Sequence, residues 1–182
     1  MSALRKLGIV IAIQAVILLG VIGFKQYTVW TGETVVLETV PIDPRDLLRG
    51  DYVTVRYEIS TLDTGDLAGD DSIDDTVYVE LRREDDGYWR AVAVHEDRRR
   101  DFDDTVLLKG KVTYQRGGFS RDDDAYNIDY GIEEIFIPEG SGRTIDEQRS
   151  RSLAVELKVD RFGNAVPRHL LVDGERLDLE RR

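Results

Sequence analysis

The stretch TVYVELRREDDGYWRAVAVH (residues 76–95) decides the fold class. Apolar and polar residues alternate over residues 77–81, and this period of two is typical of a β-strand with one buried face. The turn signal Asp85-Asp86-Gly87 follows, and a second apolar run comes after it. Asp-Gly between two such runs favours a tight turn, so we predict a β-hairpin that joins residues 76–83 to residues 88–95.

The same period of two recurs through most of the chain. Further alternating runs cover residues 35–40, 52–59, 106–114 and 153–160. We expect each strand to bury one face and to leave the other wet. The sequence therefore predicts an all-β domain, an antiparallel sandwich or barrel of about eight to ten strands. A polar helix is expected near residues 143–151, and the acidic segment 62–75 is expected to be a solvated loop.

The N-terminal segment has a different composition from the rest. Residues 7–24 are 18 residues without a charge, and a helix of that length spans about 27 Å, close to the roughly 30 Å hydrocarbon core of a bilayer. A cleaved signal sequence is the alternative, but the apolar run is longer than a typical signal core and no A-x-A-like cleavage site follows it. We predict a signal anchor in the cell membrane, with Arg5 and Lys6 keeping the N-terminus inside. The chain then divides into a cytoplasmic tail (residues 1–6), a transmembrane helix (7–24) and an extracytoplasmic β-rich domain (25–182).

Small residues gather on one face of the predicted membrane helix. They fall within about 80° when each residue turns 100°, and they are Gly8, Ala12, Ala15 and Gly23. Such a face permits close packing between helices in lipid, although Gly and Ala are common in spanning helices in any case. We therefore expect the lipid bilayer as one partner and a multi-spanning membrane protein as a second.

Composition restricts the classes of function. The chain has 25 Lys and Arg against 36 Asp and Glu, a net charge of −11, and such an acidic chain repels phosphate, so nucleic acid is not an expected partner. The absence of Cys excludes disulfides and thiolate ligands, and two isolated His do not favour zinc. No catalytic motif is present, so we predict no enzyme activity, no cofactor and no bound metal. Asp exceeds Glu and Arg exceeds Lys, a pattern that either adaptation to concentrated salt or coding bias produces.

The densest segment of the chain is PIDPRDLLRGDYVTVRY (residues 41–57), and YGIEEIFIPEG (residues 130–140) follows much later. Together with the apolar N-terminal helix, these segments resemble the GDYXXLXY family of prokaryotic single-pass membrane proteins. The string that names the family is matched at Gly50, Asp51, Tyr52 and Tyr57, with Val55 where the name has Leu. The resemblance implies a membrane location and a fold class, and it implies no biochemical activity.

Two interpretations of this segment remain open. In the structural one, two prolines stiffen a corner that begins a central strand, and the arginines there pair with neighbouring carboxylates. In the functional one, charged side chains form a groove that grips a partner or ligand; they are Asp43, Arg45, Asp46, Arg49, Asp51, Glu133 and Glu139. We expect a non-catalytic interaction or scaffolding module of a membrane assembly. The alternative is an extracytoplasmic domain that senses a ligand or a cation through this groove.

Overall fold

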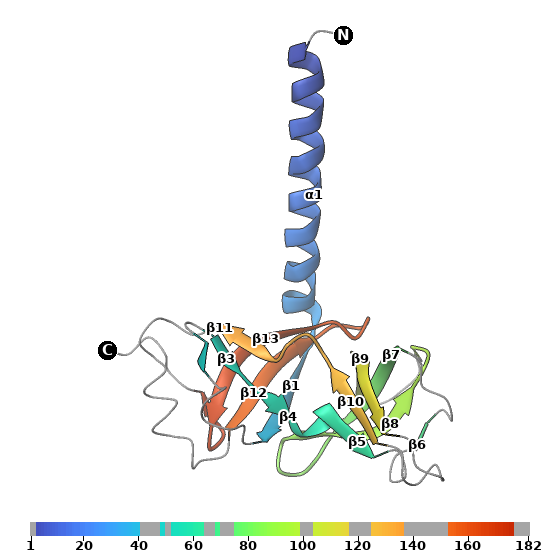
Figure 1. Cartoon of the computed structure of the whole chain (residues 1–182). Helices are drawn as coiled ribbons and strands as arrows, with labels where there is room; N and C mark the ends of the chain where they lie inside the picture. The colour runs from blue at the N-terminus through green and yellow to red at the C-terminus, as the bar shows by residue number, and fades with distance from the viewer. Residues whose placement is uncertain are drawn as a thin grey trace.

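One long helix stands on a domain built from β-strands (Figure 1). The computed structural model describes residues 3–40, 48–49, 52–63, 68–69, 75–98, 104–116, 125–136 and 153–176. Within them the strands pair antiparallel, apart from the short parallel pair β6 and β8. The predicted all-β class with one N-terminal apolar helix is confirmed.

The strands of the described residues form three sheets. The five-stranded sheet has the order β14 (Glu175–Arg176), β13 (Ala165–Val172), β12 (Leu153–Val159), β1 (Glu33–Val40) and β4 (Arg56–Tyr57). The six-stranded sheet has the order β5 (Thr61–Asp63), β10 (Ala125–Asp129), β9 (Thr105–Arg116), β7 (Thr76–Arg83), β8 (Trp89–His95) and β6 (Ala68–Gly69). The three-stranded sheet has the order β11 (Glu134–Phe136), β3 (Tyr52–Thr54) and β2 (Leu48–Arg49). Strands of two or three residues carry no readable period, so the sequence indicates the longer strands only.

The core lies between the five-stranded and six-stranded sheets, where β1 and β12 approach β8 and β9. Both sheets contribute side chains with 0% exposure, which are Val35, Leu37, Val155 and Leu157 from one and Val77, Val79, Leu81 and Leu108 from the other. All eight lie on the faces that alternation predicts to be buried. Burying an aliphatic side chain of this size contributes about 1.5–3 kcal/mol, so these faces fix the register of both sheets.

The predicted hairpin is confirmed as β7 and β8. Gly87 adopts φ +89° in the turn, a conformation that glycine reaches without steric cost. The backbone N–H of Glu84 donates to the carbonyl of Tyr88 at 2.9 Å and closes the loop. The Arg90 guanidinium then binds the carboxylates of Glu84 and Asp86. Hydrogen bonds from the Tyr88 backbone and the Arg90 side chain hold the pKa of Asp86 below its usual value, and desolvation opposes them.

The expected wet face is wrong for parts of β7 and β12. Glu80 of β7 is only 6% exposed, Glu156 of β12 is 9% exposed, and Asp160, the residue after β12, is 2% exposed. Each carboxylate has partners, as burial requires: Nε2 of His95 lies 2.9 Å from Oε2 of Glu80. An alternating pattern predicts that polar residues face outward. It does not reveal hydrogen-bond partners that lie elsewhere in the sequence.

Alternation also fails near the end of β9. It places Tyr114 inward with Val112, yet the Tyr114 side chain is 58% exposed. Opposite these residues, Asn127 pairs with Tyr114 and Ile128 pairs with Val112, so β9 has one extra residue between the two pairs. This β-bulge changes which face the following residues occupy.

The run 52–59, predicted as one strand, is divided among the three sheets. Its first part, β3, pairs with β11, and its second part, β4, pairs with β1. A 3-10 turn, η1 (Glu58–Ser60), leads to β5, which pairs with β10. Its inward side chains nevertheless remain buried as predicted. The helix expected at 143–151 and most of the loop expected at 62–75 lie outside the described residues.

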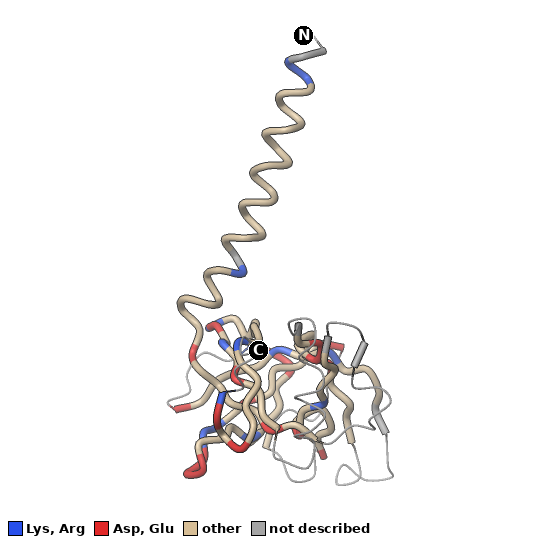
Figure 2. The backbone as a smooth tube through the Cα atoms, turned by 90° about the vertical axis from the view of Figure 1, so that its left-hand side faces the viewer, with Lys and Arg blue, Asp and Glu red and all other residues tan. Residues whose placement is uncertain are grey.

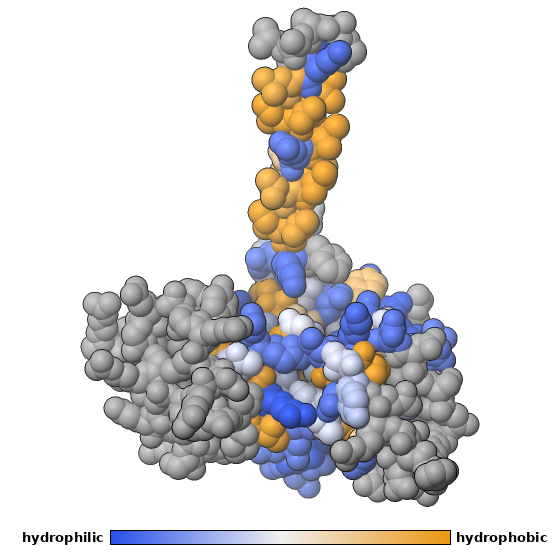
Figure 3. Space-filling model, viewed as in Figure 1, coloured by the Kyte–Doolittle hydropathy of each residue, from blue (hydrophilic) through white to orange (hydrophobic). Residues whose placement is uncertain are grey.

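The helix α1 (Ala3–Thr31) extends beyond the apolar run at both ends. Its large apolar side chains between Leu7 and Ile22 are 48–69% exposed. Figure 3 shows a mostly apolar column, and below it the coloured atoms on this face of the domain are mostly hydrophilic. In Figure 2, Lys and Arg segments lie above and below an uncharged stretch of this helix. The helix is long and apolar enough to cross a membrane.

Candidate functional site

The two segments that carry the family resemblance meet in the fold. Strand β3 pairs with β11, so residues 52–54 lie beside residues 134–136, and the backbone N–H of Val55 donates to the carbonyl of Glu133 at 2.8 Å. Two tyrosines, one from each segment, then cross between them. The Tyr57 hydroxyl donates to the carbonyl of Ile132, and the Tyr130 hydroxyl donates to the carbonyl of Ile59, both at 2.7 Å.

This tyrosine pair (Tyr57 and Tyr130) is almost completely buried, at 1% and 8% exposure. Burial, and secondarily the charge of Glu133, raises the pKa of both phenols well above the usual value. Both hydroxyls therefore stay protonated and act as permanent hydrogen-bond donors. The tyrosine pair links two parts of the chain. One is the run 52–59, which passes among the three sheets, and the other is the turn that precedes β11.

Glu133 organises that turn with its own carboxylate. Oε1 accepts from the backbone N–H of Tyr130 at 2.7 Å, and Oε2 accepts from that of Ile132 at 2.8 Å. Gly131 between them has φ +69° and donates to Oδ1 of Asp129 at 2.8 Å. Burial and the neighbouring Asp129 raise the pKa of Glu133, while the Tyr130 amide opposes the shift.

The structure describes little of the predicted charged groove. Of its members, Glu133 is described, and its carboxylate is engaged by the turn just given. A cavity of about 300 Å³ adjoins it, lined by Arg56, Asn127 and Asp129 among others. The following calls lie outside the described residues: Asp43, Arg45, Asp46, Gly50, Asp51 and Glu139, together with the side chains of Arg49 and Tyr52. The groove therefore stays a prediction.

A second polar cluster joins α1 to the β domain. The Thr28 hydroxyl, from the last turn of the helix, donates to Oδ2 of Asp160 at 2.7 Å. The same carboxylate accepts from the backbone N–H groups of Phe162 and Asn164 at 2.8 and 3.0 Å, and from the Asn164 amide. Burial by itself raises the pKa of Asp160, but these donors outweigh it and hold the pKa below its usual value.

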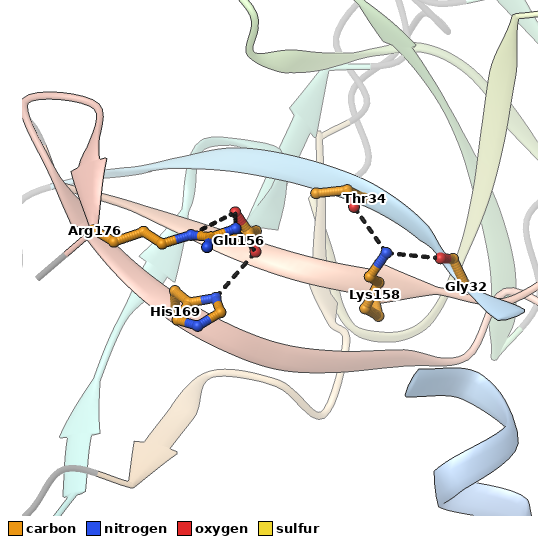
Figure 4. A network of polar contacts seen from close by, with 6 residues as sticks. All are labelled: Gly32, Thr34, Glu156, Lys158, His169 and Arg176. Atoms are coloured by element: carbon orange, nitrogen blue, oxygen red, sulfur yellow. Dashed lines mark hydrogen bonds and ion pairs between the residues drawn. The ribbon is translucent and has the colours of Figure 1, made fainter. Parts of the chain in front are cut away.

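Gly32 allows α1 to pack closely against the β domain at this joint. It is the one residue between α1 and β1, and a Cβ built on it lies 2.5 Å from the carbonyl oxygen of Thr28 and 3.0 Å from the backbone nitrogen of Val159. No other side chain fits there. Lys158 closes the joint from the sheet side, because its Nζ donates to the Gly32 carbonyl at 3.1 Å and to the Thr34 hydroxyl at 2.9 Å (Figure 4).

The same view shows a second ion-pair network farther along the five-stranded sheet (Figure 4). The Glu156 carboxylate accepts from the Arg176 guanidinium at 3.0 Å and lies 3.0 Å from Nδ1 of His169. Burial raises the pKa of Glu156, but the hydrogen bonds from Arg176 and His169 oppose it and the net pKa is below its usual value. These three residues come from β12, β13 and β14, so the network fastens the edge of the sheet.

A cavity of about 550 Å³ opens beside the joint. Its walls come from the end of α1, the start of β9 and the turn after β12, and include Thr31, Arg98, Thr105, Arg161 and Phe162. Two guanidinium groups lie on the Phe162 ring, with the Arg161 carbon 4.8 Å and the Arg98 carbon 5.1 Å from the ring centroid. Arg98 also donates to the Arg161 carbonyl at 3.1 Å.

Sequence reasoning did not select this cavity. Its residues come from three segments that lie far apart in the chain, and none of them stands in a motif. One partial signal exists, since Asp160-Arg161-Phe162-Gly163-Asn164 has the composition of a turn closed by an Asp side chain. The predicted contact residues of the helix are accessible in the described chain: no atom comes within 4 Å of a Cβ built on Gly8 or Gly23.

Comparisons with known proteins support the family resemblance of the two segments that meet in the fold. The search of curated proteins and the search of solved structures gave no significant match. The model of the family described as "GDYXXLXY protein" matches residues 14–170, which include both segments and most of the apolar helix. The chain therefore belongs to the GDYXXLXY protein family.

Proposed function

We propose that the chain is a single-pass membrane protein whose β domain is a non-catalytic interaction module outside the cytoplasm. The observation that supports it is the exposure of α1, whose large apolar side chains from Leu7 to Ile22 are all at least 48% exposed. A helix with this much apolar surface needs lipid or another helix around it. Arg5 and Lys6 precede the apolar run, which favours an N-terminus inside the cell.

The chemistry of the described polar groups supports a non-catalytic role. The tyrosine pair, Glu133 and Asp160 all bind backbone groups of their own fold. Groups engaged in this way hold a shape and are not poised to transfer protons to a substrate. A rigid domain joined closely to a membrane helix is suited to presenting a fixed surface to a partner in the same membrane.

The absence of Cys makes the topology directly testable, because one introduced thiol is the only thiol. Thr76→Cys places it on an exposed strand residue, and Ser2→Cys places it in the N-terminal tail. A membrane-impermeant maleimide should label Thr76→Cys on intact cells, and it should label Ser2→Cys only after permeabilisation. The reverse pattern, or release of the full-length chain by carbonate washing, would contradict the proposed anchoring.

The proposed partner protein can be tested by crosslinking from the small-residue face of α1. A photo-crosslinking amino acid at Ala15 faces along the predicted contact, and the same group at Ile17 points to about the opposite side, since two residues turn the helix by 200°. We expect a discrete protein adduct from Ala15 and lipid adducts from Ile17. Equal protein adducts from both positions, or none from either, would rule out a specific partner helix.

A further inference from the structure

The cavity beside the joint has the chemistry of an anion-binding site at a membrane surface. We propose that it binds the phosphate group of an anionic phospholipid, in the leaflet that faces the β domain. This inference rests on the proposed anchoring for the placement of the domain. The inference goes beyond the proposed anchoring by naming a ligand and the residues that hold this ligand, which are Arg98, Arg161 and Thr105.

The cavity lies close to the outer edge of the headgroup layer. Lys25 is the first charged residue after the apolar run, and at 1.5 Å per residue Thr31 lies about 9 Å beyond it. The headgroup region extends about 5–8 Å on each side of the hydrocarbon core. Thr31 lines the cavity, so the cavity opens close to the outer edge of the headgroup layer. Trp30, 78% exposed beside it, is the residue type that favours this interface.

The joint keeps the cavity at that height. The bond between Thr28 and Asp160 is 2.7 Å long and buried, and the rings of Tyr27 and Phe162 lie 6.4 Å apart between centroids. The turn that carries Arg161 is therefore held against the last helical turn. A domain on a flexible linker would sample many heights, whereas this domain presents one side to the membrane.

Two arginines of the cavity wall differ from most of this acidic domain. Residues 25–182 contain 23 Lys and Arg (25 less Arg5 and Lys6) against 36 Asp and Glu, a net charge of −13. In the described part of the chain, the ion pairs use other cations, and neither Arg98 nor Arg161 has a carboxylate partner. Both guanidinium groups line the cavity, and a guanidinium group can donate two parallel hydrogen bonds to phosphate oxygens.

A buried hydroxyl also lacks a partner in this cavity. Oγ1 of Thr105 is inaccessible to solvent and has no hydrogen-bond partner among the described residues, although buried polar groups normally have one. Because the hydroxyl is covered, it can donate to a phosphate oxygen in the cavity only after the Thr105 side chain rotates. The cavity also has two carboxylates in its wall. Asp160 is occupied by the donors of the joint, which leaves Glu33 at the exposed rim.

The test is native mass spectrometry of the full-length chain in mild detergent, titrated with phosphatidylglycerol or phosphatidylcholine. We expect one phosphatidylglycerol to bind saturably and phosphatidylcholine to bind more weakly. Arg98→Gln and Arg161→Gln should each weaken phosphatidylglycerol binding about tenfold, the effect of losing one charge-assisted hydrogen bond. Thr105→Val keeps the charge and shape and should also weaken binding. The control is Lys111→Gln, which removes the same charge from an exposed position about 20 Å along β9 and should bind as the wild type does.

Three outcomes would overturn the proposal. They are equal binding of both lipids, displacement of phosphatidylglycerol by an equal concentration of inorganic phosphate, and a loss in Lys111→Gln as large as in the arginine variants. Should an arginine variant fail to fold by circular dichroism, Thr105→Val decides the matter, with wild-type binding counting against the site. Lipid binding is measured in detergent and anchoring in cells, so failure of one is distinguished from failure of the other.

Discussion

Removing one hydroxyl from the tyrosine pair should destabilise the domain measurably. In Tyr57→Phe the ring remains and no cavity forms, but the carbonyl of Ile132 loses the donor that lies 2.7 Å away. The site is almost fully buried, with Tyr57 at 1% exposure, so no water is at hand to replace the bond. A buried acceptor left unsatisfied costs about 1–3 kcal/mol. For a domain of this size, each kcal/mol lowers the melting temperature by about 2–4 °C.

The measurement is urea unfolding of the full-length chain in detergent, followed by the fluorescence of Trp89, which is 6% exposed in the core. Tyr78→Phe is the matched control, because Tyr78 is only partly buried on β7, and it should change the free energy of unfolding by less than about 0.5 kcal/mol. Tyr57→Phe combined with Tyr130→Phe should lose less than the sum of the single losses, because both bonds hold the same two segments together. If Tyr57→Phe were as stable as Tyr78→Phe, the hydroxyl bonds would not be what joins the two segments.

Two further predictions concern the core and the joint. Gly110→Ala should cost about 1–3 kcal/mol of unfolding free energy through overpacking, because the new Cβ would press on Ile128 and lie 3.0 Å from the Tyr130 ring; an unchanged urea midpoint would contradict it. Asp160→Asn should destabilise the chain at pH 7 and flatten its response to acid. The pKa of Asp160 is below its usual value of 3.8, so its contribution is present above that pH and is lost as the pH falls through the lower folded value. Melting curves between pH 7 and pH 2 check this, and parallel acid profiles for wild type and variant would refute it.

The longer strands and their buried faces could be predicted from the sequence because alternation is a local property. Val77, Val79 and Leu81 repeat at period two whatever lies opposite them, and the Asp-Gly turn that follows fixes the hairpin. The long apolar helix is predictable for a similar reason, since length and apolarity are read directly from consecutive residues.

The rest depends on contacts that sequence spacing does not record. The run 52–59 alternates in the same way whether it pairs within one sheet or passes among three. Asp160 looks like an outward residue at the end of a strand, and one of the donors that make its burial favourable comes from Thr28, 132 residues away. The cavity was missed for the same reason, since its walls come together from the end of α1, the region of Arg98 and Thr105, and the turn that carries Arg161.

Only Gly32 separates α1 from β1, so no flexible stalk lies between the helix and the β domain. Under the proposed anchoring, a protease that releases ectodomains would need an extended segment to enter its cleft, whereas residues 25–33 are about two helical turns, a crowded glycine and the start of a paired strand. Shedding would first have to unwind the helix end. The distance that the domain extends from the proposed membrane is therefore set by the size of the domain itself. A larger assembly would have to contact it close to the membrane surface.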